Sequence, residues 1–258
     1  MPSALAVFAH PDDLELLCAG TLALLKKAGW DVHLATMTAG DLGTMTLTRE
    51  EISAVRRREA ADSAALLKAS YTCLGFEDLQ LGYGPEPKRR VSALMRDVGA
   101  EVVFTHAPVD YMADHEETSR IAREAAFAST IPNWTCSLNG RPSTPLKAIP
   151  AVIYADPIDL VDHFGRRTSA RQVVDVTETM PLKEKMLACH ASQKSWLKDQ
   201  HGEDDYLRYM KAWCADRAKD FGRRTVKYAE GFNQHLGHSF PKTDVLGDAL
   251  GRKVKTRK

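Results

Sequence analysis

The chain has 258 residues, enough for one large α/β domain with a substantial buried core. Its 35 Lys and Arg residues balance 34 Asp and Glu residues, so no overall field attracts nucleic acid or an acidic membrane surface, and we expect neither as a partner. Five cysteines form no CxxC pair and leave an odd count. This pattern argues against a disulfide framework or a cysteine zinc site and favours a location in the reducing cytoplasm.

We expect a single domain over residues 1–258, without a membrane span. The first residues lead straight into a strand-like run, and no apolar run approaches the ~20 residues that cross a bilayer. The Lys- and Arg-rich end, near 245–258, is typical of a solvated and flexible tail. The composition leaves open whether the chain forms homo-oligomers.

The first predicted element is a short buried strand over residues 5–8, where an apolar run is followed by a proline. Apolar residues with roughly helical spacing follow from Leu14 onward, so a helix begins soon after the strand. His10, Asp12 and Asp13 therefore lie on a strand-to-helix turn. At the carboxyl end of a parallel strand, such a turn lines the crevice in which open α/β sheets bind ligands.

Strands and helices then alternate. The predicted elements are a strand over 30–37, a loop over 38–43, a helix over 48–69, a strand over 71–74, a helix over 90–98 and a strand over 101–105. Thr48 and Glu51 have the spacing of a capping box at the start of the long helix. This alternation predicts an α/β fold: a Rossmann-like, mostly parallel sheet with helices on both faces. No GxGxxG follows the first strand, so we do not expect a dinucleotide cofactor.

The second half of the chain adds further strands and C-terminal helices. The predicted elements are a helix over 114–129, strands over 151–155 and 172–176, and helices over 181–200 and 203–221. Residues 131–149, rich in Pro, Asn and Ser, are typical of a long surface loop, and such loops often cover binding sites. This loop is our candidate for substrate choice. The alternative is an insertion that does not contact substrate.

The first turn offers a metal ion one imidazole and two carboxylates within four positions. A catalytic zinc takes three protein ligands, so the turn supplies a nitrogen and an oxygen ligand and leaves one carboxylate to act as a base. The third ligand is expected to be His115, which follows the strand over 101–105 in the same sheet. The alternative is that Asp12 or Asp13 caps the helix, as Asp often does.

These motifs resemble those of the zinc-dependent N-deacetylases of the PIG-L/LmbE family, and the likeness extends over most of the chain. The motifs that carry it are Ala9-His10-Pro11-Asp12-Asp13, Thr38-Ala39-Gly40-Asp41, Arg56-Arg57-Arg58-Glu59-Ala60, Asp114-His115, His190-Ala191-Ser192-Gln193 and Tyr228-Ala229-Glu230-Gly231-Phe232. The first motif is specific and the later ones are weaker.

The resemblance implies that His10, Asp13 and His115 bind one Zn²⁺ per subunit and that Asp12 is the general base. Another divalent metal would suit the same ligands. Asp114 is expected to orient the neighbouring ligand, because ligating histidines normally need a carboxylate or carbonyl partner.

The resemblance also implies two groups of substrate-binding residues. Arg56 corresponds to an arginine that the family places three residues before the glutamate of the same motif. The sequence departs from the family at Met112, where the family has a histidine credited with stabilising the oxyanion. Methionine cannot donate a hydrogen bond, so we expect another side chain to fill this role. The candidates are Tyr111 and His106 nearby and, more distant along the chain, His235 and His238.

The expected reaction is metal-dependent hydrolysis of an N-acyl group, expected to be acetyl, on a small acetamido sugar or a sugar-like molecule. Zinc would activate a water, and Asp12 would take its proton and return it to the leaving amine. Two other interpretations stay open. One is a hydrolase of another amide or ester, and the other is a non-catalytic zinc-binding or ligand-binding protein, which the methionine at position 112 favours.

Overall fold

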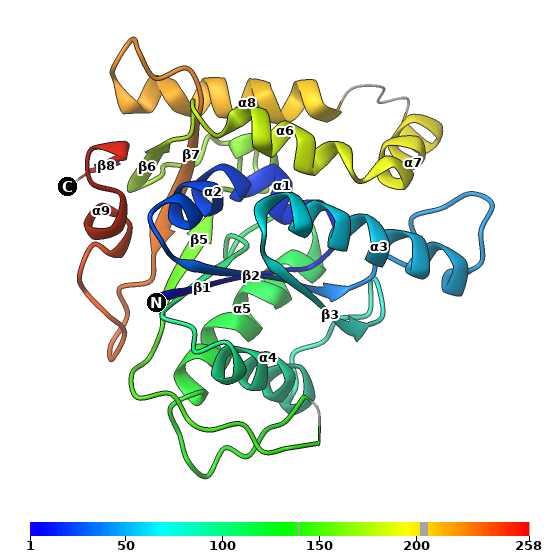
Figure 1. Cartoon of the computed structure of the whole chain (residues 1–258). Helices are drawn as coiled ribbons and strands as arrows, with labels where there is room; N and C mark the ends of the chain where they lie inside the picture. The colour runs from blue at the N-terminus through cyan, green and yellow to red at the C-terminus, as the bar shows by residue number, and fades with distance from the viewer. Residues whose placement is uncertain (139, 202–205, 258) are drawn as a thin grey trace.

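A computed structural model of the protein describes residues 1–138, 140–201 and 206–257. Within this part, one eight-stranded sheet has the strand order β3-β2-β1-β4-β5-β7-β6-β8, and helices cover both of its faces (Figure 1). The strands are β1 (Ser3–Phe8), β2 (Asp31–Thr38), β3 (Ser70–Phe76), β4 (Val102–Thr105), β5 (Ala151–Ala155), β6 (Gln172–Asp175), β7 (Ala229–Gln234) and β8 (Val254–Thr256).

The helices are α1 (Asp13–Leu17), α2 (Ala19–Lys27), α3 (Arg49–Leu67), α4 (Pro85–Asp97), α5 (Ala113–Ala128), α6 (Met180–Ala188), α7 (Ala191–His201), α8 (Tyr206–Phe221) and α9 (Val245–Leu250). Two short 3₁₀ turns, Ile158–Leu160 and Gly251–Lys253, follow β5 and α9. None of the described helices combines the length and the apolar character needed to cross a membrane.

The first five strands form the parallel half of the sheet, with β1 at its centre. Side chains of β1 alternate between two cores: Ala6 and Phe8 pack with α1 and α2, whereas Leu5 and Val7 pack on the side of α4 and α5. A central parallel strand covered on both faces must be apolar throughout, which explains its uninterrupted apolar sequence. The predicted α/β fold, with its mostly parallel sheet and extra C-terminal helices, is confirmed.

Helix α3 begins with the predicted capping box. The Thr48 hydroxyl accepts from the Glu51 amide, while the Glu51 carboxylate accepts from the Thr48 amide. These reciprocal bonds satisfy amide groups that would otherwise lack a partner at the helix start. They fix the residue at which this helix begins. The same helix places Arg56 at the carboxyl edge of the sheet.

The C-terminal half differs from the sequence prediction in two places. Strand β7 was not expected, and it lies between β5 and β6, antiparallel to both. The helix expected over 181–200 is two helices, α6 and α7, which meet at Cys189 and His190. The break coincides with the burial of His190 against α1, where its Nε2 lies 3.4 Å from Glu15 Oε1.

The basic C-terminal end is ordered rather than the flexible tail that its composition predicts. The Asp244 carboxylate caps α9 by accepting from the Gly247 amide, and β8 pairs with β6 in antiparallel register. Lys253 also forms an ion pair with Glu178, with an Nζ–Oε2 distance of 2.8 Å. Pairing of β8 with β6 satisfies the backbone hydrogen-bonding groups of this segment. Amino-acid composition alone does not predict such pairing.

A buried ion pair connects this C-terminal half to the first turn. The Glu230 carboxylate of β7 accepts from the amides of Gly20 and Thr21 at the start of α2. The Lys183 ammonium of α6 lies 2.5 Å from Glu230 Oε1 and donates to the Leu16 carbonyl at 2.9 Å. Because both charged side chains are buried, each depends on the other for compensation.

We expect Glu230→Gln to lower the free energy of unfolding by about 3–5 kcal/mol, the usual effect of leaving a buried charge without its partner. Urea unfolding monitored by circular dichroism measures this change. The matched control is Glu178→Gln, which removes an exposed ion pair and should change stability by about 0–1 kcal/mol. Equal effects of the two substitutions would contradict a stabilising role for the buried pair.

Candidate metal centre and active site

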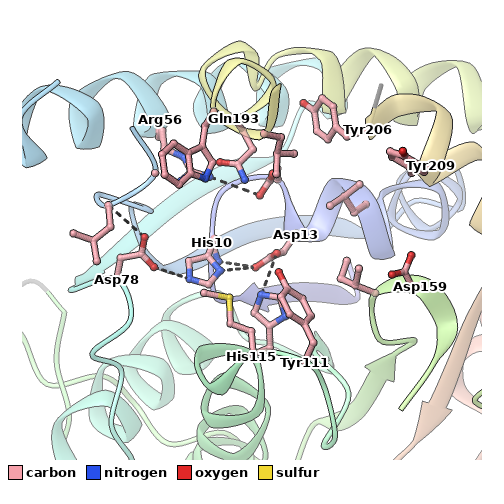
Figure 2. Close-up of a pocket in the computed structure, with 18 of the residues that line it drawn as sticks. His10, Asp13, Arg56, Asp78, Tyr111, His115, Asp159, Gln193, Tyr206 and Tyr209 are labelled. Atoms are coloured by element: carbon pink, nitrogen blue, oxygen red, sulfur yellow. Dashed lines mark hydrogen bonds and ion pairs between the residues drawn. The ribbon is translucent and has the colours of Figure 1, made fainter. Parts of the chain in front are cut away.

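A cavity of about 750 Å³ opens at the carboxyl edge of the parallel strands (Figure 2). Each of these five strands is followed by a segment that contributes to the wall. The segments supply His10 after β1, Leu42 after β2, Asp78 after β3, Tyr111 after β4 and Asp159 after β5, and α7 and α8 complete the wall. This is the position at which parallel α/β sheets bind ligands.

The turn after β1 carries three of the predicted site residues into this cavity. Asp12 adopts a left-handed backbone conformation with φ of 98°, which is uncommon for a residue other than glycine. Its side chain makes no hydrogen bond that caps α1, and Asp13 accepts instead from the His10 amide at 2.7 Å. The helix-cap alternative therefore does not explain either carboxylate. Backbone strain of this kind often occurs at functional sites.

Asp13 is the point at which the histidines converge. Its Oδ1 lies 3.4 Å from His115 Nε2, and its Oδ2 lies 3.4 Å from His10 Nδ1 and 3.1 Å from His106 Nε2. The rings of His106 and His115 also stack, with centroids 3.9 Å apart. The ends of β1 and β4 thus bring together the three residues predicted from the sequence.

Each of the two cavity-lining histidines has a carboxylate partner on the side away from Asp13. His115 Nδ1 lies 3.0 Å from Asp110 Oδ1. His10 Nε2 lies 2.9 Å from Asp78 Oδ1 and 3.3 Å from Asp114 Oδ2. Asp114 is thus a partner of His10, and Asp110 rather than Asp114 orients His115. The Asp114 carboxylate also accepts from the Leu79 amide, at 2.8 Å.

Burial and charge shift the pKa values of this group in opposite directions. Burial raises the pKa of Asp13, but the neighbouring His115 and His106 hold it well below its usual range. Burial lowers the pKa of His10, but Asp114, Asp13 and Asp78 together raise it well above its usual value. Burial also lowers the pKa of His106, to about 4. Asp13 is therefore held as a carboxylate, the form that binds a metal ion.

The donor set of His10, Asp13 and His115 fits a divalent metal ion. Two nitrogen donors and one oxygen donor approach within 4.8 Å of one another, and tetrahedral ligands at ~2.0–2.2 Å from zinc are ~3.4 Å apart. Two further groups could hold an ion, namely His106, Asp110 and His115, and His10, Asp78 and Asp114. Only the first group has all three members in the described wall of the cavity.

Asp12 also lines the cavity but stands apart from these donors. Its Oδ1 lies 3.8 Å from the Arg56 guanidinium, which is only 3% exposed and donates to the Gly40 and Pro11 carbonyls. Burial raises the pKa of Asp12 to about 7, while Arg56 opposes the shift. This leaves a carboxyl group in the wall whose oxygens are not shared with His10 or His115.

The residues proposed to replace the missing histidine occupy very different places. Met112 and Tyr111 line the cavity, and Tyr111 is 70% exposed. His106 is fully buried behind Asp13 and does not line the cavity, which corrects its predicted contact with substrate. His235 packs against Tyr154 and Phe240 away from the described wall, and His238 does not line it either.

The loop over 131–149 was our candidate for substrate choice. Its position in the structure favours the alternative, an insertion that does not contact substrate. Its described residues contribute nothing to the cavity wall. The buried Arg96 of α4 donates to the carbonyls of Ile131 and Ser143 and holds the loop against α4 and α5 instead. Ile158, Asp159 and residues of the helices α7 and α8 line the cavity instead of this loop.

Sequence reasoning missed several residues of the site. Asp78 and Asp110 gave no local signal, because an isolated acid in a loop is usually solvated. Gln193 lines the cavity, and its amide oxygen is buried without a hydrogen-bond partner among the described residues. The motif His190-Ala191-Ser192-Gln193 could have indicated a site residue, but its close spacing on one helix suggested a structural role for the motif. That role belongs to Ser192, whose amide and hydroxyl donate to Glu59 of α3.

Comparison with known proteins finds a family match over the part of the chain that carries these residues. Residues 5–126 match the PIG-L family, described as "GlcNAc-PI de-N-acetylase". The matched part is a little under half of the chain. It contains the turns after β1 and β4 and therefore all the residues of the proposed ligand set.

The chain is also similar to bacterial and archaeal proteins over most of its length. A Bacillus anthracis protein named "Probable N-acetyl-alpha-D-glucosaminyl L-malate deacetylase 2" is 27% identical over 205 residues, 73% of this chain and 80% of its own. The N,N'-diacetylchitobiose deacetylase of Pyrococcus horikoshii is 26% identical, with a TM-score of 0.75 over 94% of this chain and 88% of its own. The 4-carboxy-2-hydroxymuconate hydratase of Pseudomonas putida KT2440 shares the fold, with a TM-score of 0.76 over 94% of this chain and all of its own at 22% identity.

His115→Ala is expected to lose most of the bound divalent metal, because it removes one of three protein ligands. Elemental analysis of purified protein measures the metal content per chain. His235→Ala is the matched control, since His235 lies outside the described wall, and it should keep its metal. Full retention of metal in His115→Ala would instead favour the group formed by His10, Asp78 and Asp114.

Proposed function

We propose that the protein is a metal-dependent hydrolase that removes the N-acetyl group of a small acetamido sugar or sugar-like molecule. The observation that carries this proposal is the convergence of two histidines and one carboxylate beside a separate carboxylate, Asp12, in the wall of a single cavity. Deacetylases of N-acetylglucosamine conjugates among the relatives support the substrate class. Zinc is the proposed native metal, because it favours nitrogen and oxygen donors with an open position.

The proposed ligands are His10, Asp13 and His115. A bound divalent cation would polarise the amide carbonyl as a Lewis acid and lower the pKa of a water. Asp110 would orient His115, and Asp78 with Asp114 would orient His10, each by accepting a hydrogen bond from the ring nitrogen opposite the metal.

Asp12 is the proposed general base and then general acid. Its carboxylate takes a proton from the attacking water as the new C–O bond forms at the amide carbonyl. The same oxygen then delivers the proton to the nitrogen as the C–N bond breaks, which leaves acetate and a free amine. Arg56, which lies 3.8 Å from Asp12, fixes this carboxylate and favours its charged form before the reaction.

The fold by itself does not select this reaction. A hydratase with the same fold shows that this scaffold also carries water addition to a carbon–carbon double bond. The proposal is tested by assaying the metal-loaded protein against a panel of acetamido sugars and N-acetylglucosamine conjugates, with release of acetate as the readout. Absence of acetate release from the whole panel, under conditions where another amide, ester or enoate is turned over, would contradict it.

Asp12→Asn is expected to lower kcat by ~10²–10⁴, because the amide cannot accept the proton. The substitution should leave the fold and the metal content unchanged. Asp31→Asn, at an exposed carboxylate near the start of β2, is the matched control and should retain full activity. If Asp12→Asn loses its metal while activity per metal persists, Asp12 is a ligand rather than the base.

Tyr111 is the only one of the four candidates for the missing oxyanion donor that lines the described cavity wall. Its ring packs edge-on against His115, with centroids 5.3 Å apart. We expect Tyr111→Phe to lower kcat by at least ~10-fold with metal intact, the lower limit for loss of such a donor. Tyr83→Phe, at a partly exposed tyrosine outside the described wall, is the control. Unchanged kcat in Tyr111→Phe would assign oxyanion stabilisation to the metal or to a backbone amide.

A further inference from the structure

One end of the cavity is built from aromatic side chains that the proposed reaction does not use. They come from α7 and α8, and we call them the aromatic wall: Trp196, Tyr206, Tyr209 and Trp213. Apolar side chains of Leu16, Ile158 and Leu197 continue the same surface. A molecule bound at the metal centre therefore extends toward a largely apolar space.

The aromatic wall is only partly buried in the core of α8. Tyr206, Tyr209 and Trp213 follow at spacings of three and four residues, so they share one face of the helix. Tyr206 is buried in the core with Met210 and Cys214, whereas Tyr209 and Trp213 are only half-buried. The rings of Tyr209 and Trp213 lie at 22° to each other with centroids 6.5 Å apart. These two rings line the cavity without being fully buried in the interior.

Hydrogen bonding leaves the ring of Tyr206, rather than its hydroxyl, available to a ligand. The Tyr206 hydroxyl is buried and donates to the Leu187 carbonyl at 2.6 Å, with the His190 carbonyl 3.2 Å away. A phenol anchored in this way presents a flat apolar surface. Flat apolar groups and the faces of sugar rings pack well on such surfaces.

The charges in the described wall disfavour a negatively charged group at this end. Four carboxylates, those of Asp12, Asp13, Asp78 and Asp159, line the cavity, whereas Arg56 is the only lysine or arginine among the described lining residues. Figure 2 shows Asp159 near Tyr209, on the opposite side of the cavity from Arg56 and Asp78. Arg56 is moreover occupied by two backbone carbonyls and Asp12. Carboxylates and phosphates are normally bound by arginine or lysine, which this end lacks in the described wall.

Asp159 is held at this position by an unusual backbone. Both Asp159 and Leu160 have φ of 60°, and two successive left-handed residues other than glycine are sparsely populated. No hydrogen bond or ion pair of the Asp159 side chain occurs among the described residues. Its exposed carboxylate therefore contributes an uncompensated negative charge beside the aromatic wall.

We propose that the substrate carries, next to its acetamido group, a flat apolar substituent without negative charge, which packs on the aromatic wall beside Asp159. This inference rests on the proposed deacetylase function and specifies its substrate class. The cavity volume of about 750 Å³ is in the range that accommodates a drug-sized ligand, larger than a single sugar ring. The substituent lies on the side of Tyr206 and Tyr209, away from Arg56.

The test uses four glycosides of N-acetylglucosamine with the same anomeric configuration: methyl, phenyl, 4-carboxyphenyl and 4-(trimethylammonio)phenyl. For each, kcat/KM is measured with the metal-loaded enzyme, and Kd is measured by calorimetry with the metal-loaded Asp12→Asn protein. We expect the phenyl glycoside to bind at least ~10-fold more tightly than the methyl glycoside, the size expected for one buried aromatic ring. The 4-carboxyphenyl glycoside should lose at least ~3-fold relative to phenyl, and the cationic glycoside should not.

Variants locate the effect within the cavity. Trp213→Ala should reduce the preference for phenyl over methyl by at least ~5-fold, and Trp213→Phe, which keeps a ring, should retain most of it. Trp134→Ala is the matched control, because Trp134 packs on Arg89 outside the described wall. Asp159→Asn should raise the affinity for 4-carboxyphenyl relative to phenyl by ~3-fold, and asparagine tolerates the left-handed backbone.

The two readouts separate this inference from the proposed function. If none of the glycosides releases acetate but the order of Kd values is as expected, the deacetylase proposal fails and the aromatic wall remains the binding surface for the apolar group. If acetate is released with equal kcat/KM for methyl and phenyl, or with a preference for 4-carboxyphenyl, the inference about the substituent is overturned and the deacetylase proposal stands. Equal Kd values for methyl and phenyl in Asp12→Asn would also overturn it.

Discussion

The burial of negative charge at the carboxyl edge of the sheet is the constraint on which the site depends. Asp13 has almost no contact with solvent, yet the histidines around it keep it charged. An isolated carboxylate in such a place would be protonated rather than ionised. His10 and His115 compensate Asp13, and they in turn require Asp78, Asp114 and Asp110 on their other sides. The result is a network in which every member needs its neighbours, and the proposed divalent cation would add positive charge to it.

The fold brings this network together because neighbouring parallel strands end at the same edge of the sheet. The turn after β1 provides His10, Asp12 and Asp13, and the segment after β4 provides Asp110 and His115. Arg56 holds the turn after β1 and the loop after β2 in place by donating to the Pro11 and Gly40 carbonyls. Any side chain on Gly40 would collide with the Arg56 guanidinium, since an added Cβ would lie 2.0 Å from Nη1. The glycine and the arginine of the two family motifs are therefore explained by one contact.

The two halves of the cavity have different origins and different chemistry. The polar half belongs to the parallel strands and lies within residues 5–126, the part that matches the PIG-L family. The aromatic half comes from helices α7 and α8, which follow in sequence. Ser192 of α7 donates to Glu59 of α3, and Tyr206 of α8 donates to the Leu187 carbonyl of α6. In the proposed enzyme, the catalytic groups would lie on the rigid sheet edge and the substrate-binding surface on the appended helices.

The sequence by itself determined the parallel α/β sheet and the ligand candidates, because both are local signals. Apolar periodicity decides whether a segment is a strand or a helix, and the first motif places His10, Asp12 and Asp13 within four positions. Only the tertiary structure decided which carboxylate faces which ring. Asp114 is adjacent to His115 in sequence but contacts His10, because helical geometry directs neighbouring side chains to different sides. The same holds for His106, which is buried behind Asp13, and for the tail, which pairs with β6: burial and strand pairing depend on segments far away in sequence.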